Sequence, residues 1–262
     1  MDRRIDGRFA PRLSSRGFET RAGSCRISGV RRCSGAPERR RDKLAAAVGR
    51  GVAVYSWRCR LGGLAINTTA FGIGGICKQP KLVGVRHIVQ SEPDERFLLQ
   101  PEFLRGVSLL EEYDLAYDIL IYPKHLPVAV EFVRKFPRQR LVLDHLAKPR
   151  IKEQAIHPWA EGIRELAVFP NVYCKMSGLV TEAHWKDWKL EDLAPYLEVA
   201  LESFGPERLM IGSDWPVCTV AASYSRTVNA VVQYLSQLRE DVREKVLGAN
   251  AQKFYKLRVP FD

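Results

Sequence analysis

Apolar and polar positions change their pattern near residue 78. From there onward, short apolar runs alternate with longer amphipathic ones. Five runs rich in Val, Ile, Leu and Tyr predict strands covered on both faces, at residues 82–89, 116–122, 140–146, 171–177 and 208–213. Helices are predicted at residues 126–136, 193–204, 222–238 and 240–255, where the apolar spacing is helical. Alternation of this kind predicts parallel βαβ units.

Parallel βαβ units build either a closed barrel or an open doubly wound sheet. The open, dinucleotide-binding form carries Gly-x-Gly-x-x-Gly after its first strand. The run that starts at Gly72 comes closest, but Cys77 occupies the third glycine position and no helix start follows. A Walker-type Gly-Lys-Ser/Thr is also absent from the sequence. We therefore predict an α/β, (β/α)8 TIM-barrel-like fold.

The first 77 residues differ from the rest in texture and charge. Residues 1–60 hold 16 Lys and Arg against 5 Asp and Glu, whereas residues 61–262 hold 25 of each, so the net charge of +11 lies entirely in this segment. Such a composition buries too little apolar surface to offset the entropy of ordering. We predict an atypical basic segment, disordered or aberrant, at residues 1–77, and a barrel domain at residues 78–262. Translation in a wrong reading frame would also produce such an Arg-rich, aperiodic stretch.

Bulk composition narrows the class of protein. The six cysteines form no Cys-x-x-Cys pair, and a chain of 262 residues does not need disulfides, so we expect reduced thiols and a cytoplasmic protein. No run reaches the roughly 18 apolar residues of a membrane span. Because the charge is balanced beyond residue 60, nucleic-acid binding would depend on the basic arm alone, and we do not expect nucleic acid as a partner.

Polar residues gather at the predicted carboxyl ends of the five strands, where parallel α/β folds place their active sites. A single polar strand end is usually a cap or a turn, whereas five together favour a site. These residues are Arg86, His87 and Gln90 on the first strand, Lys124 and His125 after the second, Asp144, His145 and Lys148 at the third, Lys175 and Ser177 at the fourth, and Asp214 and Trp215 after the fifth.

The residue types leave several roles open. Asp214 could act as a base or could cap the turn that precedes Pro216. His145 could be a metal ligand, a general acid or a buried histidine paired with Asp144. The chain holds no His-x-His, His-Glu-x-x-His or Cys/His cluster of zinc spacing. A metal site built from distant residues stays open, with His145 and Asp214 as candidate ligands.

Four segments together resemble the amidohydrolase-related lactonases, the group of L-fuconolactonase-like and pyrone-dicarboxylate-lactonase-like enzymes. They are residues 80–87 (PKLVGVRH), 143–149 (LDHLAKP), 171–179 (NVYCKMSGL) and 212–216 (GSDWP). Each is weak alone, but their order and spacing are specific. The resemblance extends from about residue 80 to residue 255.

The resemblance implies a distorted barrel that hydrolyses a small sugar-derived or carboxylated lactone. Asp214 would be the general base on the attacking water, while His145 and Arg86 would polarise the carbonyl or hold a substrate carboxylate. Some relatives bind zinc or another divalent ion and others need none, so either no cofactor or one divalent metal is implied. We expect the remaining strand-end residues to bind substrate: His87, Gln90, His125, Lys148, Lys175, Ser177 and Trp215.

The chain departs from this family at its N-terminus. Members begin with a strand bearing His-x-His, but this chain has no histidine before His87. We therefore expect a barrel that is incomplete at its N-terminus, with unpaired sheet edges. Two other functions stay open: a metal-dependent decarboxylase on a related barrel, and an inactive or binding protein whose basic arm binds its partner in a salt-dependent way. Homo-oligomerisation also stays open.

Overall fold

The computed structural model describes residues 27–28, 53–57 and 82–257. Most of the segment predicted to be disordered or aberrant, residues 1–77, thus lies outside the described residues. Two short strands in that segment are described, β1 (Ile27–Ser28) and β2 (Ala53–Trp57). The domain boundary at residue 78 stays a prediction.

The described strands form one sheet with the order β1-β2-β3-β4-β5-β6-β7. Neighbours from β2 to β7 are parallel, and β1 pairs with β2 in the antiparallel sense. All five predicted strands are present, each somewhat shorter than expected. They are β3 (Leu82–Ile88), β4 (Ala116–Leu120), β5 (Leu141–Leu143), β6 (Val172–Met176) and β7 (Leu209–Ile211).

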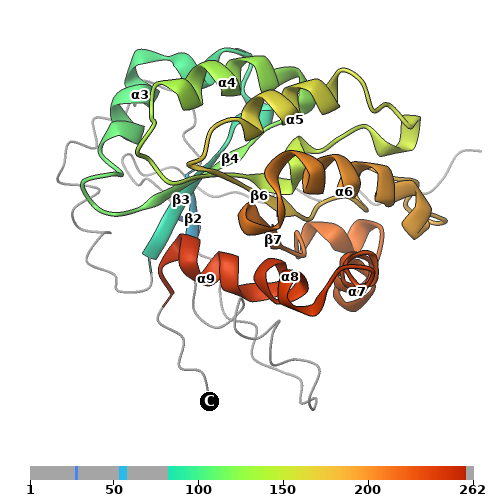
Figure 1. The fold of residues 1–262 in the computed structure, drawn as a ribbon. Coiled ribbons are helices and arrows are strands. Elements are labelled where there is room, and N and C mark those ends of the chain that lie inside the picture. Colours follow the sequence, from blue (N-terminus) through green and yellow to red (C-terminus); the bar gives the residue numbers. More distant parts are fainter. Residues whose placement is uncertain (1–26, 29–52, 58–81, 258–262) are drawn as a thin grey trace, which may run out of the picture.

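Helices follow the strands in the alternation that the sequence predicts (Figure 1). The predicted helix at 240–255 is present as two α-helices joined by a π-helical turn, Lys245–Ala249. Two helices, α3 and α5, were not predicted. The helices are α3 (Pro101–Ser108), α4 (Leu126–Arg134), α5 (Trp159–Ala167), α6 (Leu190–Phe204), α7 (Tyr224–Leu235), α8 (Glu240–Glu244) and α9 (Asn250–Tyr255).

The two faces of the sheet have different covers. Successive strand residues point to opposite faces, so Leu141 and Leu143 join the large core shared with the helices, while Val142 faces the other way. Val142 packs with Phe254 and Tyr255 of α9, which lies on the opposite side of the sheet from α4 and α5 (Figure 1). We call the α9 side the inner face, because it corresponds to the interior of a barrel.

The inner face changes character along the strands. Near the strand starts it is apolar, where Ala116, Val142 and Met210 contact α9. Farther along it is charged, because Arg86 pairs in register with Asp118 on the neighbouring strand. Charged side chains on the inner face therefore lie towards the carboxyl ends of the strands.

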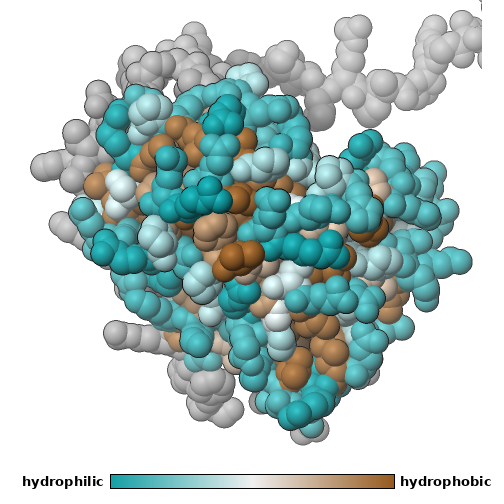
Figure 2. Space-filling model, turned by 45° about the horizontal axis from the view of Figure 1, so that its top comes forward, coloured by the Kyte–Doolittle hydropathy of each residue, from teal (hydrophilic) through white to brown (hydrophobic). Residues whose placement is uncertain are grey.

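Polar side chains cover most of the molecular face seen in Figure 2, and apolar side chains appear between them in patches. Within the described part of the chain, no helix is both long and apolar enough to cross a bilayer.

Candidate active site

Four charged side chains form an ion-pair cluster on the inner face: Arg86, Asp118, Asp144 and Lys175. The Arg86 Nη1 atom donates to Asp144 Oδ2 at 2.8 Å. The Lys175 ammonium lies 2.7 Å from Asp144 Oδ1 and also donates to Asp118 Oδ2. Each side chain comes from a different strand or strand end, so the sheet register holds the cluster together.

Burial and charge act against each other in this cluster. Burial alone would raise the pKa of Asp144, but Lys175, His145 and Arg86 bring it below its ordinary value. Burial likewise would lower the pKa of Lys175, but Asp118 and Asp144 raise it well above its ordinary value. For Asp118 burial prevails, and its pKa is raised despite Lys175. Lys175 is thus a cation at neutral pH.

A left-handed turn follows β5 and carries the next two site residues. His145, Leu146, Ala147 and Lys148 all have φ between 53° and 57°. Non-glycine residues seldom adopt this conformation, so the surroundings must hold it. The backbone N–H of Lys148 donates to the carbonyl of His145 at 2.8 Å, and Trp159 Nε1 donates to the Leu146 carbonyl at 2.7 Å.

The turn places His145 between Ser177 and Asp214. His145 Nδ1 lies 2.7 Å from Ser177 Oγ, and His145 Nε2 lies 3.2 Å from Asp214 Oδ1. Burial lowers the pKa of His145 to about 4, although Asp144 and Asp214 oppose this effect. The imidazole is therefore neutral at pH 7. Because Nε2 faces a carboxylate, we assign the proton to Nε2, and Nδ1 then accepts from the Ser177 hydroxyl.

Lys148 holds the second oxygen of Asp214. Its Nζ donates to Asp214 Oδ2 at 2.6 Å and to Thr181 Oγ1 at 2.7 Å, and lies 3.4 Å from Glu182 Oε1. The Asp214 carboxylate thus accepts a donor on each oxygen while its side chain keeps 9% of its surface exposed. Such an arrangement fixes the carboxylate and leaves lone pairs for one more donor, such as a water.

The structure brings together Asp214, His145, Lys148, Ser177, Lys175 and Arg86. Of the four other predicted residues, three make their contacts elsewhere. His87 is stacked on Phe97, and its Nε2 lies 2.7 Å from Glu92 Oε1. Gln90 donates to the Ile121 carbonyl, and His125 Nδ1 accepts from the Tyr122 N–H. Trp215, next to Asp214, has 44% of its surface exposed. Substrate contact by these four residues stays a prediction.

Sequence reasoning missed Asp118, Thr181 and Tyr255. Asp118 lies inside β4, where all five residues are buried, so a charged residue in an otherwise apolar strand was the available signal. Tyr255 donates to Asp118 from α9, at the far end of the described chain. No local pattern marks that contact.

The described residues do not fit a metal ion. Protein zinc sites use three or four ligands. Within residues 27–28, 53–57 and 82–257, no group of three or more His, Cys, Asp or Glu side chains could hold a metal. His145 and Asp214, the two candidate ligands, contact each other, and Lys148 occupies the other oxygen of Asp214.

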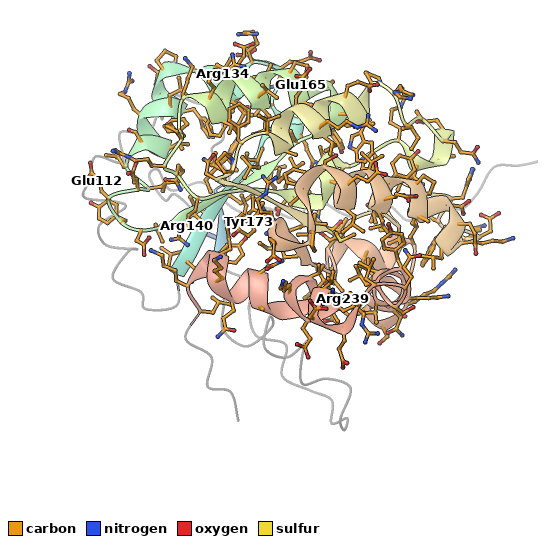
Figure 3. All side chains as sticks on the ribbon, viewed as in Figure 1. Glu112, Arg134, Arg140, Glu165, Tyr173 and Arg239 are labelled. Atoms are coloured by element: carbon orange, nitrogen blue, oxygen red, sulfur yellow. The ribbon has the colours of Figure 1, made fainter. Side chains whose placement is uncertain are left out.

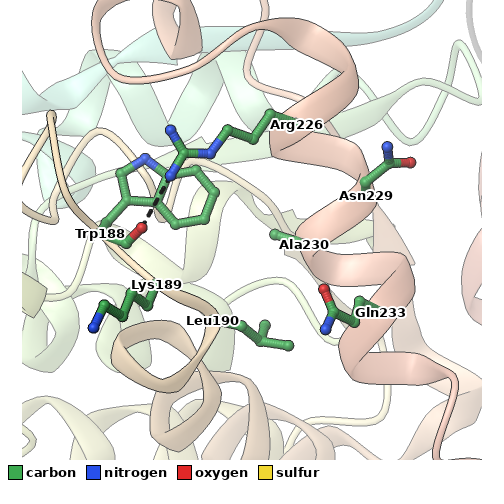
Figure 4. Close-up of a pocket in the computed structure, with 7 residues that line it drawn as sticks. All are labelled: Trp188, Lys189, Leu190, Arg226, Asn229, Ala230 and Gln233. Atoms are coloured by element: carbon green, nitrogen blue, oxygen red, sulfur yellow. Dashed lines mark hydrogen bonds between the residues drawn. The ribbon is translucent and has the colours of Figure 1, made fainter.

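A pocket of about 500 Å3 lies in the helical layer, apart from the strand ends (Figure 4). There Arg226 stacks over the Trp188 ring at 4.2 Å and donates to the Trp188 carbonyl. Its other lining residues are Lys189, Leu190, Asn229, Ala230 and Gln233. None of the candidate site residues lines it.

Parallel strands, alternating helices and a polar site at the carboxyl ends of the strands define a TIM-barrel-like protein. The chain belongs to the amidohydrolase family, whose model, described as Amidohydrolase, matches residues 33–257. The resemblance recognised in the four motifs is thereby confirmed, and the match begins upstream of them.

Individual relatives agree with this assignment. The chain is 41% identical over 193 residues to an L-fucono-1,5-lactonase of Burkholderia multivorans and 36% identical over 195 residues to one of Burkholderia ambifaria. These matches cover 70% and 72% of this chain and 65% and 66% of the relatives, so the chain spans slightly less than two thirds of their length. The structure resembles that of a zinc-bound amidohydrolase from B. multivorans, with a TM-score of 0.74, 36% identity, and coverage of 82% of this chain and 76% of that one. The predicted barrel-like fold is thus confirmed.

Proposed function

We propose that this chain hydrolyses a small, uncharged sugar-acid lactone, with Asp214 as the general base. The main support is the geometry of Asp214, whose two oxygens are held by His145 and Lys148 at the carboxyl ends of the strands. The two lactonases at 41% and 36% identity support the same reaction class.

The reaction follows from these side chains. A water oxygen adds to the lactone carbonyl carbon while Asp214 accepts the water proton. Once Asp214 has taken the water proton it is a weaker acceptor, so the Nε2–H of neutral His145 and the Lys148 ammonium can turn from Asp214 to the developing oxyanion. Collapse of the intermediate breaks the ring C–O bond, and Asp214 returns the proton to the leaving alkoxide. The product is an open-chain hydroxy acid.

The charges at the site favour an uncharged substrate. Arg86, Lys148 and Lys175 each lie within 2.8 Å of a carboxylate oxygen. A dicarboxylate would need cations that are not already neutralised, because an unpaired charge in a buried site is costly. The same reasoning disfavours decarboxylation, whose substrate carries a carboxylate.

A lactone panel tests the proposal. Sugar-acid 1,5- and 1,4-lactones and a pyrone dicarboxylate are assayed with the wild type, Asp214→Asn and the exposed control Asp241→Asn. We expect turnover of a sugar-acid lactone, and Asp214→Asn should lower kcat by about 10²–10⁴-fold because the proton acceptor is lost. Equal turnover by wild type and Asp214→Asn would refute the role of Asp214. Turnover of the dicarboxylate alone would refute the uncharged substrate.

The proposal also includes the location of the protein and its independence of a metal ion. Cys174 and Cys218 are buried free thiols, which supports a reduced, cytoplasmic protein. The proposed hydrolysis includes no step on a metal ion, because the described residues supply too few ligands for one.

A further inference from the structure

The C-terminal helix α9 reaches the ion-pair cluster through one side chain. The Tyr255 hydroxyl donates to Asp118 Oδ1 at 2.9 Å and to Asp118 Oδ2 at 3.0 Å. Both residues are buried, and the Lys175 ammonium lies 5.5 Å from the centre of the Tyr255 ring. Neither Asp118 nor Tyr255 has a part in the hydrolysis described above.

We propose that Tyr255 is a positioning residue for the strand-end site: its hydroxyl holds Asp118 in the ionised form, and Asp118 in turn holds Lys175 against Asp144, next to His145. The structural contacts carry this inference, and it depends on the proposed lactonase function only for its activity measurement.

The charge balance of the cluster explains why one hydroxyl matters. Asp118 faces Lys175 from β6, Asp144 from the turn after β5, Arg86 from β3 and Tyr255 from α9. Two cations therefore balance two carboxylates. Burial raises the pKa of Asp118, and a hydrogen bond to the ionised carboxylate opposes that rise. Without the Tyr255 hydroxyl, Asp118 accepts a proton at higher pH, and Lys175 is left with Asp144 as its one ionised partner.

Contacts other than the Tyr255 hydroxyl keep α9 docked. The Phe254 ring packs 4.7 Å from the Tyr173 ring, and Arg140 donates to the Phe254 carbonyl. Figure 3 shows Arg140 and Tyr173 near α9. Removal of a single oxygen from Tyr255 should therefore leave the helix in place, so the variant Tyr255→Phe removes only the contacts of the hydroxyl: its hydrogen bond to Asp118 and the one that it shares with Lys175. Tyr173→Phe removes a hydroxyl from the same packing cluster and serves as the matched control.

The first measurement is a titration that does not need activity. Aspartate side-chain carboxyls are labelled with ¹³C, and the Asp118 signal is assigned by its absence in Asp118→Asn. We expect this signal to titrate at higher pH in Tyr255→Phe than in the wild type and in Tyr173→Phe. An unchanged titration in Tyr255→Phe would overturn the proposal.

The second measurement is the pH profile of lactone turnover. In Tyr255→Phe we expect the acid limb of kcat to move to higher pH and kcat at acidic pH to fall roughly tenfold, about the factor that one hydrogen bond to a charged group contributes. KM should change little, since a residue that acts through Asp118 affects the reacting groups and not the binding of substrate. If the Asp118 titration shifts while no protein hydrolyses any lactone, the positioning role stands and the proposed function fails.

A double-mutant cycle separates a positioning role from a loss of packing. If Tyr255 acts through Asp118, then Tyr255→Phe should have no further effect on the profile in an Asp118→Asn background. Additive effects of the two substitutions would overturn the proposal. Thermal unfolding of all four proteins is measured alongside, so that a loss of stability in either single variant is recognised.

Discussion

At the scale of single residues, Gly178 lies where His145 and Asp214 approach each other. Its φ is +64°, and a Cβ there would lie 2.6 Å from His145 Cβ and 3.1 Å from Asp214 Oδ2. The φ value alone costs a non-glycine residue about 1–2 kcal/mol. We expect Gly178→Ala to destabilise the protein by at least that amount and to lower kcat by up to about 10²-fold, because the imidazole must move. Urea unfolding and lactone kinetics check both effects.

Gly205 provides a control for this substitution. Its φ is +65°, but nothing lies within 4 Å of a Cβ built there. Gly205→Ala should destabilise the fold through the backbone alone and leave kcat of the folded protein unchanged. If both variants lose activity equally, the contact of Gly178 with His145 is not what matters.

His145 makes stability depend on pH. Its pKa in the folded protein is about 4, below the value of about 6.5 expected in the unfolded chain. Its contribution to stability is therefore complete above pH 6.5 and is lost as pH falls towards 4, since only the unfolded chain takes up the proton. The loss is on the order of 3 kcal/mol. Urea unfolding between pH 4 and 8 should show it as a difference between wild type and His145→Gln, whereas the exposed-site variant His184→Gln should follow the wild type.

At the scale of elements, the left-handed turn at residues 145–148 depends on α5. Trp159 of that helix is 2% exposed, and its indole N–H donates to the Leu146 carbonyl. Trp159→Phe leaves a buried carbonyl unpaired and should cost about 1–3 kcal/mol of stability. Trp185 also donates to a backbone carbonyl but is 56% exposed, so Trp185→Phe should change stability by less than about 0.5 kcal/mol. If Trp159→Phe and Trp185→Phe lowered the free energy of unfolding in denaturant by similar amounts, the hydrogen bond from Trp159 would not be what holds the turn.

At the scale of the whole molecule, the arrangement of the strand ends determines how many metal ligands the described residues can supply. The described residues bring His145 and Asp214 together without a third protein ligand. We therefore expect a chelator to leave lactone turnover unchanged and added zinc to leave it within about twofold of its starting value, well below the effect expected for a catalytic metal. Loss of activity with chelator and its recovery with zinc would show that ligands come from outside the described residues.

The fold could be predicted from the sequence to a large extent. The strands β3, β4 and β6 coincide with their predicted positions within two residues at each end. The predicted strand at 140–146 ended too late: β5 ends at Leu143, before a left-handed turn in which Leu146 and Ala147 are apolar and buried like strand residues. Helix α5 was missed because its apolar stripe, including Trp159 and Ile163, is short and interrupted by charged residues.

The candidate site could be predicted only in part. Strand-end position identified Asp214, His145, Lys148 and Lys175, because parallel strands bring their carboxyl ends to one edge whatever the sequence between them. The same rule also predicted His87 as a site residue. His87, however, lies on the opposite face of β3 from Arg86 and packs with Phe97. Position at a strand end does not specify which face a side chain occupies.

The sequence alone determined the type of fold and the residue types at its functional edge, because both follow from local periodicity and from motifs that are contiguous in the chain. Tertiary structure alone decided which of those residues meet: His145 with Ser177, Asp214 with Lys148, and Asp118 with Tyr255, 137 positions away. Such pairs depend on sheet register, on the left-handed turn and on the docking of α9. These arise only when distant segments bury a common surface, so no short stretch of the chain encodes them.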